Sequence, residues 1–242
     1  ALVGFTSVFA QVPQIPMVEH FTQASCGPCA SQNPAMKTTL DNFGTANYVR
    51  ISHQVSWPGF DPMYNNFPAG PDDRRTYYGI TGVPNTVLNG GAPGAPNTIV
   101  TSATLASAGA QMTPYQITAT QSWANPNSVT VNIDVDNVTG ASINDADKIF
   151  VAMVENEITY TSAPGSNGET SFEYVLREMY DATTGTPGAT AGAALGAKVG
   201  IAMGPLGAIA GTIPGAILGG IFGKSLGNKY DKPRCPKCAT KF

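Results

Sequence analysis

The apolar and polar positions in the first half of the chain follow the patterns of short strands that alternate with helices. Alternating or continuous apolar runs at 16–22, 48–55 and 83–89 predict β-strands. The segments between and after these runs predict a loop over 56–73 and helices over 26–43, 72–79 and 97–111. This order of elements predicts an α/β domain over residues 1–113.

The first twelve residues, ALVGFTSVFAQV, leave two interpretations open. Val8-Phe9-Ala10 has the form of a cleavage site at the end of a secretory signal, but the segment contains neither a Met nor basic residues. We therefore expect residues 1–12 to form a first strand that is retained in the mature protein.

The pattern changes after the last predicted helix. Segments 128–135 and 148–161 are rich in β-branched residues and are separated by Asn, Gly and Ser. Residues 171–180 predict either a last strand or a short helix. We expect a β-sandwich-like segment over residues 114–180.

Glycines recur every four residues over much of the segment 181–228, with an interruption at Gly204-Pro205. The glycines that define this repeat most clearly are Gly192, Gly196, Gly200, Gly211, Gly215 and Gly219. A four-residue step places them along one helical face, where another backbone can approach closely. The segment therefore predicts a glycine-zipper helical hairpin with arms at 188–204 and 207–227. It resembles the glycine-zipper segments of bacterial envelope and membrane-active proteins.

Each arm of this hairpin contains roughly 20 residues, about the length of a membrane span. Lys198 is the only charged residue between Thr183 and Gly223. A hairpin with so few charged residues must be shielded from water. Two alternatives provide this: insertion into a membrane, or burial inside a protein oligomer.

The composition narrows the classes of function. Charged residues make up 12% of the 242 residues, about half the usual share, and the net charge is -3. The absence of a basic excess argues against a nucleic-acid partner. The four cysteines form two pairs of the same spacing, which favours redox chemistry or metal binding over a scattered disulfide framework.

The first cysteine pair is Cys26-Gly-Pro-Cys29, between a predicted strand and a predicted helix. Unpaired N–H groups and the positive end of the helix dipole favour a thiolate at this position. We expect Cys26 to be the nucleophile and the more exposed of the two. Cys29, one turn further on, would resolve the mixed disulfide.

Three features together resemble the thioredoxin superfamily: the CGPC sequence, Pro34 five residues after Cys29, and the Gly-Val-Pro-Asn-Thr run at 82–86. The resemblance implies that the Val83–Pro84 peptide bond is cis and faces the cysteines. It also implies that the backbone of Val83 pairs with an extended substrate. A cis bond before proline is rare enough to mark a specific structural role.

The chain departs from the thioredoxin pattern at two places. Ser25 stands where thioredoxins usually have a Trp before the first cysteine, and His20 stands at the position of their buried acid. Glu19 lies next to His20. The resemblance assigns the movement of protons to His20 or Glu19, and an imidazole has a pKa suited to it.

A narrower resemblance, over residues 14–180, is to the Omp28-related outer-membrane lipoproteins of Bacteroidetes, which join a thioredoxin-like domain to a β-sandwich. The segments that carry it are VEHFTQASCGPC, ISHQVSWPGFDPMYNN, RRTYYGITGVPNTVLNG, VAMVEN and FEYVLREM. In that family the sandwich continues with further strands, whereas this chain enters its glycine-rich segment. An open sheet edge would result, and we expect a homo-oligomer that covers it.

The second cysteine pair, Cys235-Pro-Lys-Cys238, lies in a basic tail at 229–242. It is half of a zinc-ribbon site, but no third or fourth ligand is nearby in the sequence. The alternatives are a local or intersubunit disulfide, a zinc ion shared between chains, and a redox partner for the CGPC pair. We expect no other cofactor. The basic tail also suits contact with anionic lipid headgroups.

Two hypotheses about function remain open. In the first, the chain is a thiol–disulfide oxidoreductase that acts on protein thiols or disulfides and is anchored or assembled through the hairpin. In the second, it is a non-enzymatic structural or membrane-active subunit of an envelope or virion, with the thioredoxin-like domain as a scaffold. Both predict a secreted, periplasmic, outer-membrane-associated or virion protein.

Overall fold

The computed structural model describes residues 11–125, 128–143 and 148–180, together with the backbone of four short strands beyond them. The elements of the first part are β1 (Val12–Pro13), β2 (Met17–Thr22), α1 (Gly27–Phe43), β3 (Val49–Gln54), α2 (Pro62–Asn66), α3 (Ala69–Tyr77), β4 (Asn85–Leu88), α4 (Pro96–Ile99), α5 (Ser102–Gly109) and β5 (Met112–Thr113). The later strands are β6 (Tyr115–Asn125), β7 (Ser128–Asn137), β8 (Lys148–Thr159), β9 (Ser171–Tyr180), β10 (Thr186–Pro187), β11 (Val199–Met203), β12 (Ala208–Ile213) and β13 (Ala216–Leu218).

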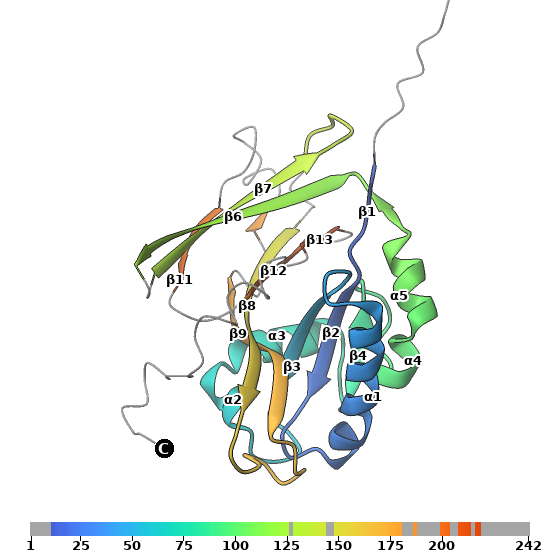
Figure 1. Cartoon of the computed structure of the whole chain (residues 1–242), viewed down its shortest axis with the longest axis vertical. Helices are drawn as coiled ribbons and strands as arrows, with labels where there is room; N and C mark the ends of the chain where they lie inside the picture. The colour runs from blue at the N-terminus through green and yellow to red at the C-terminus, as the bar shows by residue number, and fades with distance from the viewer. Residues whose placement is uncertain are drawn as a thin grey trace, which may run out of the picture.

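One long sheet runs through both halves of the chain, in the strand order β13-β12-β8-β9-β3-β2-β4 (Figure 1). Strands β2 and β3 are parallel, and β4 is antiparallel to β2. Strand β9 runs parallel to β3 and antiparallel to β8. The strands expected in the sandwich-like segment 114–180 therefore divide between two sheets, because β8 and β9 extend the α/β sheet while β6 and β7 pair with each other.

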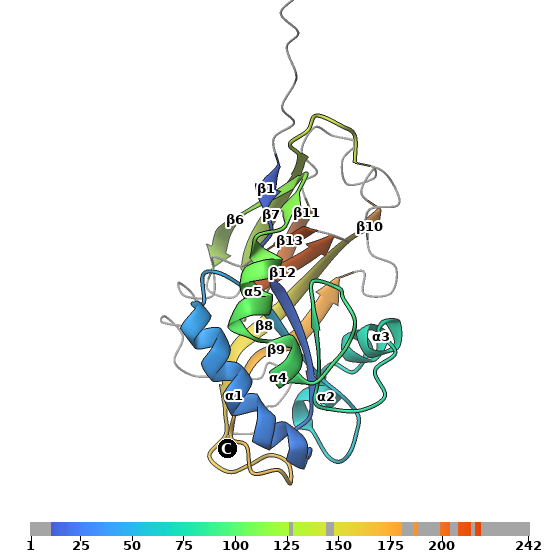
Figure 2. The same cartoon turned by 90° about the vertical axis from the view of Figure 1, so that its right-hand side faces the viewer.

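Helices cover both faces of the sheet at β2–β4, with α1 and α5 on one side and α3 on the other (Figure 2). Val18 of β2 packs against Met36 and Leu40 of α1 and against Leu105 of α5. Neighbouring residues of a strand point to opposite faces, so the even-numbered residues of β2 face α1 and the odd-numbered ones face α3.

Strands β6 and β7 form a second layer over β8. Val131, Ile133 and Val135 of β7 form one apolar cluster with Ile149 and Val151 of β8. Two sheets therefore pack on each other in this segment, as a sandwich-like arrangement requires. One sheet contains β6 and β7, and the other is the β8 end of the long sheet.

One loop prediction and one helix prediction were wrong in their boundaries. The expected loop 56–73 contains α2 and the start of α3, because the Asp61 carboxylate caps α2 and Pro62 fits its first turn. The expected helix 97–111 is divided into α4 and α5, because Thr101 adopts an extended conformation and starts a new capping box with Thr104. Residues 171–180, for which strand and short helix were both open, form β9.

Most of the glycine-rich segment 181–228 lies outside the described residues. The pieces that are described, β10, β11, β12 and β13, are extended: β10 pairs with β8, β11 pairs with β7, and β12 pairs with β8 and β13. The helical hairpin as a whole stays a prediction. The expected first strand at 1–12 is described only from residue 11, and its end forms β1, which pairs with β5.

Candidate redox site

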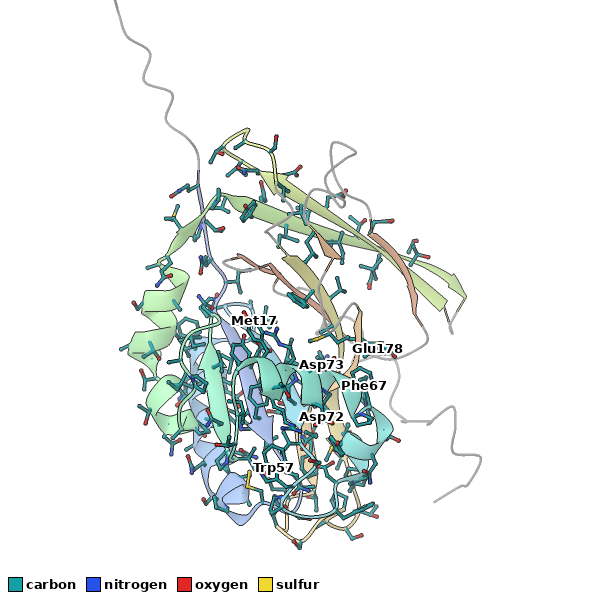
Figure 3. All side chains as sticks on the ribbon, turned by 180° about the vertical axis from the view of Figure 1, so that it is seen from behind. Met17, Trp57, Phe67, Asp72, Asp73 and Glu178 are labelled. Atoms are coloured by element: carbon teal, nitrogen blue, oxygen red, sulfur yellow. A yellow bond between two sulfur atoms is a disulfide. The ribbon has the colours of Figure 1, made fainter. Side chains whose placement is uncertain are left out.

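A disulfide joins Cys26 and Cys29 at the N-terminus of α1, with an S–S distance of 2.05 Å. Cys26 is the N-cap residue of the helix, and its Sγ accepts a hydrogen bond from the backbone N–H of Cys29 at 3.1 Å. After reduction, this N–H and the helix N-terminus would stabilise negative charge on the Cys26 sulfur. Figure 3 shows the disulfide bond in yellow beside the labelled Trp57, at the end of the long sheet away from β6 and β7.

The Val83–Pro84 peptide bond is cis, as the resemblance to the thioredoxin superfamily implied. The carbonyl oxygen of Val83 lies 3.6 Å from Cys26 Sγ, so the structure brings this loop against the disulfide. Val83 is held there by an apolar cluster that includes Phe21 of β2 and Val87 of β4.

Both cysteines are buried, with exposed fractions of 1% for Cys26 and 0% for Cys29. Cys26 is the slightly more exposed of the two, which is the predicted order, but the low exposure of both was not predicted. Two loops, at 57–61 and 163–169, pack on the turn that leads into α1, and neither is signalled by the motif itself.

The first covering loop is attached to the cysteine turn by hydrogen bonds on both sides of Phe60. Gln23 Nε2 donates to the Gly59 carbonyl at 2.5 Å, and Ser25 Oγ donates to the Phe60 carbonyl at 2.8 Å. The N–H of Ala24 donates to the carboxylate of Asp61 at 2.8 Å. This loop therefore forms part of the wall of the site.

The second covering loop joins β8 to β9. The side-chain amide of Asn167 donates to the carbonyls of Gln23 and Cys26, at 3.2 and 3.3 Å. Its backbone N–H donates to the Ala24 carbonyl at 3.2 Å. A Cβ on Gly165 would lie 2.2 Å from the Ala24 oxygen, so the close approach requires glycine there. The only sequence signal for this contact is the turn-forming run Gly165-Ser-Asn-Gly168.

Glu19, one of the two residues expected to move protons, lies in a buried ionic network on the α3 side of the sheet. Its carboxylate accepts hydrogen bonds from Arg74 Nε at 2.9 Å and from the Tyr78 hydroxyl at 2.6 Å, and it contacts His53 Nε2 at 3.0 Å. Burial raises its pKa, but the hydrogen bond with His53 and the charge of Arg74 outweigh burial and lower the pKa to about 2. Glu19 is therefore ionised at neutral pH.

His20 lies on the opposite face of β2, the face that packs under α1. It is fully buried, and its register places Ser52 of β3 and Thr86 of β4 beside it. Neither ring nitrogen has a hydrogen-bond partner among the described residues. Burial, followed by the nearby charge of Arg50, lowers the pKa of His20 well below its usual value, so the imidazole is neutral.

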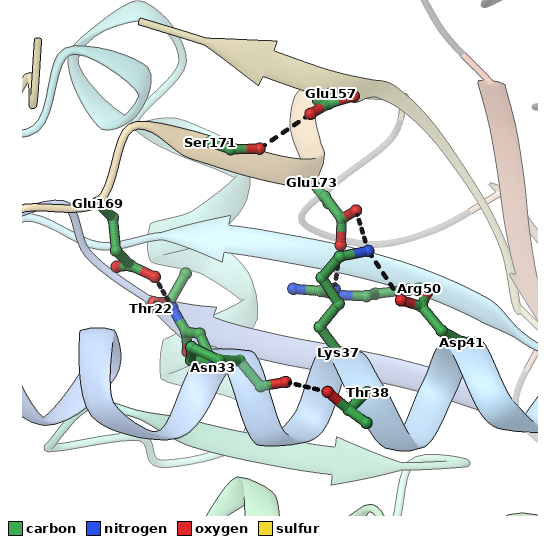
Figure 4. A network of polar contacts seen from close by, with 11 residues as sticks. Thr22, Asn33, Lys37, Thr38, Asp41, Arg50, Glu157, Glu169, Ser171 and Glu173 are labelled. Carbon is green, nitrogen blue, oxygen red and sulfur yellow. Dashed lines mark hydrogen bonds and ion pairs between the residues drawn. The ribbon is translucent and has the colours of Figure 1, made fainter.

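A polar cavity of about 200 Å³ lies on this same face, between α1 and β9. Its lining includes Asn33 and Lys37 of α1, Ser52 and Gln54 of β3, and Glu173 of β9. Lys37 Nζ bonds to Glu173 at 2.7 Å, and Asn33 Nδ2 bonds to Glu169 at 2.8 Å, also on the lining (Figure 4). Ser52 Oγ and both polar atoms of Gln54 have no partner among the described residues. Below the cysteine helix, the structure therefore buries several polar atoms that have no partner among the described residues.

The remaining predicted site residues are only partly described. Cys235 and Cys238, with the zinc or disulfide expected there, lie outside the described residues, as do Gly192, Gly196, Gly215 and Gly219. The backbone of Gly200 pairs with Asn132 in β7, and that of Gly211 pairs with Val151 in β8. Among the described residues, no three His, Cys, Asp or Glu side chains are grouped to hold a metal. No helix in the described part of the chain has the length and apolar character needed to cross a bilayer.

A CxxC disulfide at a helix N-terminus, beside a cis proline on a mixed sheet with helices on both faces, defines a thioredoxin-like domain. The fold is similar to that of HBP35 of Porphyromonas gingivalis, with a TM-score of 0.63 and 12% sequence identity. The similarity covers 84% of this chain and 69% of the other.

Two further comparisons concern the sequence. The family described as "Glycine zipper" (Gly-zipper_Omp) matches residues 187–234, which confirms the glycine-zipper segment. None of the curated proteins matches the chain. The narrower resemblance to Omp28-related lipoproteins stays a prediction.

Proposed function

We propose that this chain is an envelope protein whose thioredoxin-like domain exchanges disulfides with other proteins, and that its glycine-zipper segment anchors or assembles it. The observation that carries the redox part is the position of Cys26 Sγ, 3.1 Å from the Cys29 N–H and 3.6 Å from the Val83 carbonyl. The Cys29 N–H can stabilise a thiolate on Cys26, and the Val83 backbone can bind an extended polypeptide. Both groups lie next to the same sulfur.

The exchange begins from the reduced pair. The Cys26 thiolate attacks one sulfur of a substrate disulfide, and the other substrate sulfur leaves as a thiolate, which takes up a proton. Cys29, after losing its proton, attacks the Cys26 sulfur and releases the second substrate thiol. The substrate gains two electrons, and the Cys26–Cys29 disulfide is formed. The reverse sequence oxidises a substrate dithiol.

Within this proposal, His20 rather than Glu19 accepts the proton of Cys29. Glu19, with a pKa of about 2, already carries its charge and has its oxygens occupied by Arg74, Tyr78 and His53. His20 is neutral and has unoccupied ring nitrogens among the described residues. An unoccupied imidazole nitrogen can relay a proton, but the lowered pKa of His20 makes it a weak base, so the proton does not stay on it.

The envelope assignment is supported by the glycine-zipper family match at 187–234 and by the near absence of charge between Thr183 and Gly223. In this proposal the segment associates with a membrane or with other copies of the chain. Protein thiols and disulfides in the same compartment are the proposed partners.

One observation favours the second candidate function, that of a structural or membrane-active assembly subunit. Both cysteines are almost completely buried under the loops 57–61 and 163–169, which is typical of a structural disulfide. In that case the thioredoxin-like domain serves as a scaffold and its disulfide stabilises the fold.

Reduction and alkylation of the full chain separate the two functions. For an oxidoreductase we expect the Cys26–Cys29 disulfide to be reduced under native conditions by a dithiol. Alkylation of Cys26 should then follow a thiolate pKa below the usual 8.5. Mass spectrometry assigns the label, and a Cys235→Ser/Cys238→Ser variant excludes the second pair. A disulfide that is reduced only in denaturant would establish the structural role instead.

A further inference from the structure

Phe60 is an exposed large apolar residue on the wall of the candidate redox site, with 62% of its surface accessible. It lies in the loop 57–61, whose backbone is attached to the cysteine turn through Gln23, Ser25 and Ala24. Because both neighbouring residues are fixed, the ring cannot be buried by a collapse of the loop onto the domain.

Two details show how firmly Phe60 is placed. A Cβ on Gly59 would lie 2.7 Å from the Ser25 Cβ, so the loop approaches the residue before Cys26 as closely as a glycine permits. On the other side, the Asp61 carboxylate accepts hydrogen bonds from Ala24 and also from Met63 and Tyr64 at the start of α2. The position of the Phe60 backbone relative to the cysteine turn is therefore set by a helix cap and a close backbone contact.

The surface around Phe60 is uncharged. Three loops meet here, namely 25–28, 57–61 and 81–84, and their one charged residue, Asp61, is 2% exposed and paired with three backbone N–H groups. Arg75, which reaches this region from α3, already stacks over the Trp57 ring at 4.9 Å and bonds to Asp72 at 2.8 Å. An apolar segment of polypeptide can lie here without leaving a charge unpaired.

The other exposed large apolar residues of the described chain lie in different settings. Tyr77 packs edge-on against Tyr78, with 4.9 Å between ring centres, and lies 5.0 Å from the Arg74 guanidinium. Met112 is in β5, which pairs with β1 at the opposite end of the domain. Phe60 combines high exposure with direct attachment to the cysteine turn.

From this geometry we propose that Phe60 is a specificity-determining residue, which selects substrate polypeptides with an aromatic or aliphatic side chain next to the reacting cysteine. The proposal rests on the proposed function and names its substrate class. The substrate cysteine must come to Cys26 Sγ, and Phe60 lies beside the residue that precedes Cys26, so a side chain close to that cysteine is the one that meets the ring. Burial of such a contact from water is worth roughly a ten- to hundred-fold change in affinity.

The test uses the full chain and two synthetic peptide disulfides of equal length. One carries Phe two residues from its cysteine, and the other carries Ser there. The ratio of their kcat/KM values measures the preference for an apolar neighbour. We expect Phe60→Ala to lower this ratio by about ten- to hundred-fold, and Phe60→Leu to restore most of it. Met112→Ala, the matched exposed control, should leave both rates unchanged.

Three results would overturn the inference. These are an unchanged ratio in Phe60→Ala, an equal loss with both peptides, or a change from dimer to monomer in Phe60→Ala by sedimentation, which would mean that a second copy of the chain occupies the surface. If the wild-type chain exchanges with neither peptide, the proposed function fails. Docking is then decided by fluorescence anisotropy, where the Phe-bearing peptide should still bind the wild type more tightly than Phe60→Ala.

Discussion

Replacing Glu19 with Gln tests whether the ionic network on the α3 side of the sheet stabilises the folded chain. The substitution preserves the shape of the side chain and removes its charge, leaving Arg74 and the Tyr78 hydroxyl opposite a neutral amide. Glu19 is 2% exposed and Arg74 is 6% exposed, so water cannot replace the lost partner. We expect the variant to be substantially less stable than the wild type at pH 7.

The size of the effect follows from the pKa of Glu19. The folded chain lowers it from the ordinary 4.5 to about 2, which corresponds to about 3 kcal/mol in favour of the ionised form. A carboxyl group with a lowered pKa contributes stability above its unfolded pKa and loses it as the pH falls toward its folded pKa. The wild type should therefore lose about 3 kcal/mol between pH 4.5 and pH 2, and Glu19→Gln should lose that amount already at pH 7.

Urea unfolding, followed by circular dichroism at several pH values, measures both effects. His20 and His53 are buried with lowered pKa values, so their acid sensitivity begins near their ordinary 6.5, above the range in which Glu19 titrates, and continues as the pH falls toward their folded pKa values. Asp41→Asn is the matched control, because the Lys37–Asp41 ion pair is about half exposed and should contribute no more than about 1 kcal/mol. If Glu19→Gln does not fold, Tyr78→Phe removes the two hydrogen bonds of the Tyr78 hydroxyl, which donates to Glu19 and accepts from Arg74, and should cost about 1 kcal/mol or more.

Ordinary surface substitutions change the free energy of unfolding by roughly 0.5 kcal/mol or less. The reasoning would be refuted if Glu19→Gln differed from the wild type by no more than about this amount at pH 7. It would also be refuted if the variant and the wild type had the same pH dependence below pH 4.5.

Three further predictions concern the cover, the polar interior and the glycine segment. Asn167→Ala removes two hydrogen bonds to the cysteine turn and should speed native-state reduction of the Cys26–Cys29 disulfide about 5- to 30-fold. Quenched alkylation measures this rate. An unchanged rate would mean that the β8–β9 loop does not control access to the disulfide. His20→Leu removes a buried imidazole that has no hydrogen-bond partner among the described residues. We expect it to raise the free energy of unfolding in urea by about 1–3 kcal/mol and to slow disulfide exchange. A loss of stability would show that the imidazole forms hydrogen bonds in solution. Gly196→Leu and Gly215→Leu should each abolish liposome flotation or assembly by size-exclusion chromatography while disulfide chemistry persists, and unchanged behaviour in both would remove the case for a glycine zipper.

Local signals in the sequence were sufficient for the redox motif and for most elements around it. The Cys26–Cys29 pair, the start of α1 and the cis bond before Pro84 depend on a few neighbouring residues, and all were predicted. The separation of Glu19 and His20 onto opposite faces of β2 follows from strand alternation, but their partners come from other elements.

The features that the sequence did not reveal all depend on contacts between distant residues. Asn167 contacts Gln23 across 144 positions, and nothing near either residue indicates the other. Likewise, residues 171–180 were expected to form a last strand or a short helix of the sandwich-like segment, and only the pairing of β9 with Ser52 of β3 places them in the α/β sheet. The burial of Cys26 is a result of these long-range contacts and could not be inferred from the CGPC motif.

The pairing of β9 with β3 also orders the events of biosynthesis. A chain that emerges from its N-terminus presents Cys26 and Cys29, with β2, β3 and β4, well before Gly165, Asn167 and β9 have appeared. During that interval the sulfurs lie on a partial domain without the β8–β9 loop, open to whichever oxidant or reductant the compartment supplies. The arrival of residues 163–180 then closes over the pair. The contacts that cover the cysteine turn in the folded domain are therefore complete only after residues 163–180 have been added.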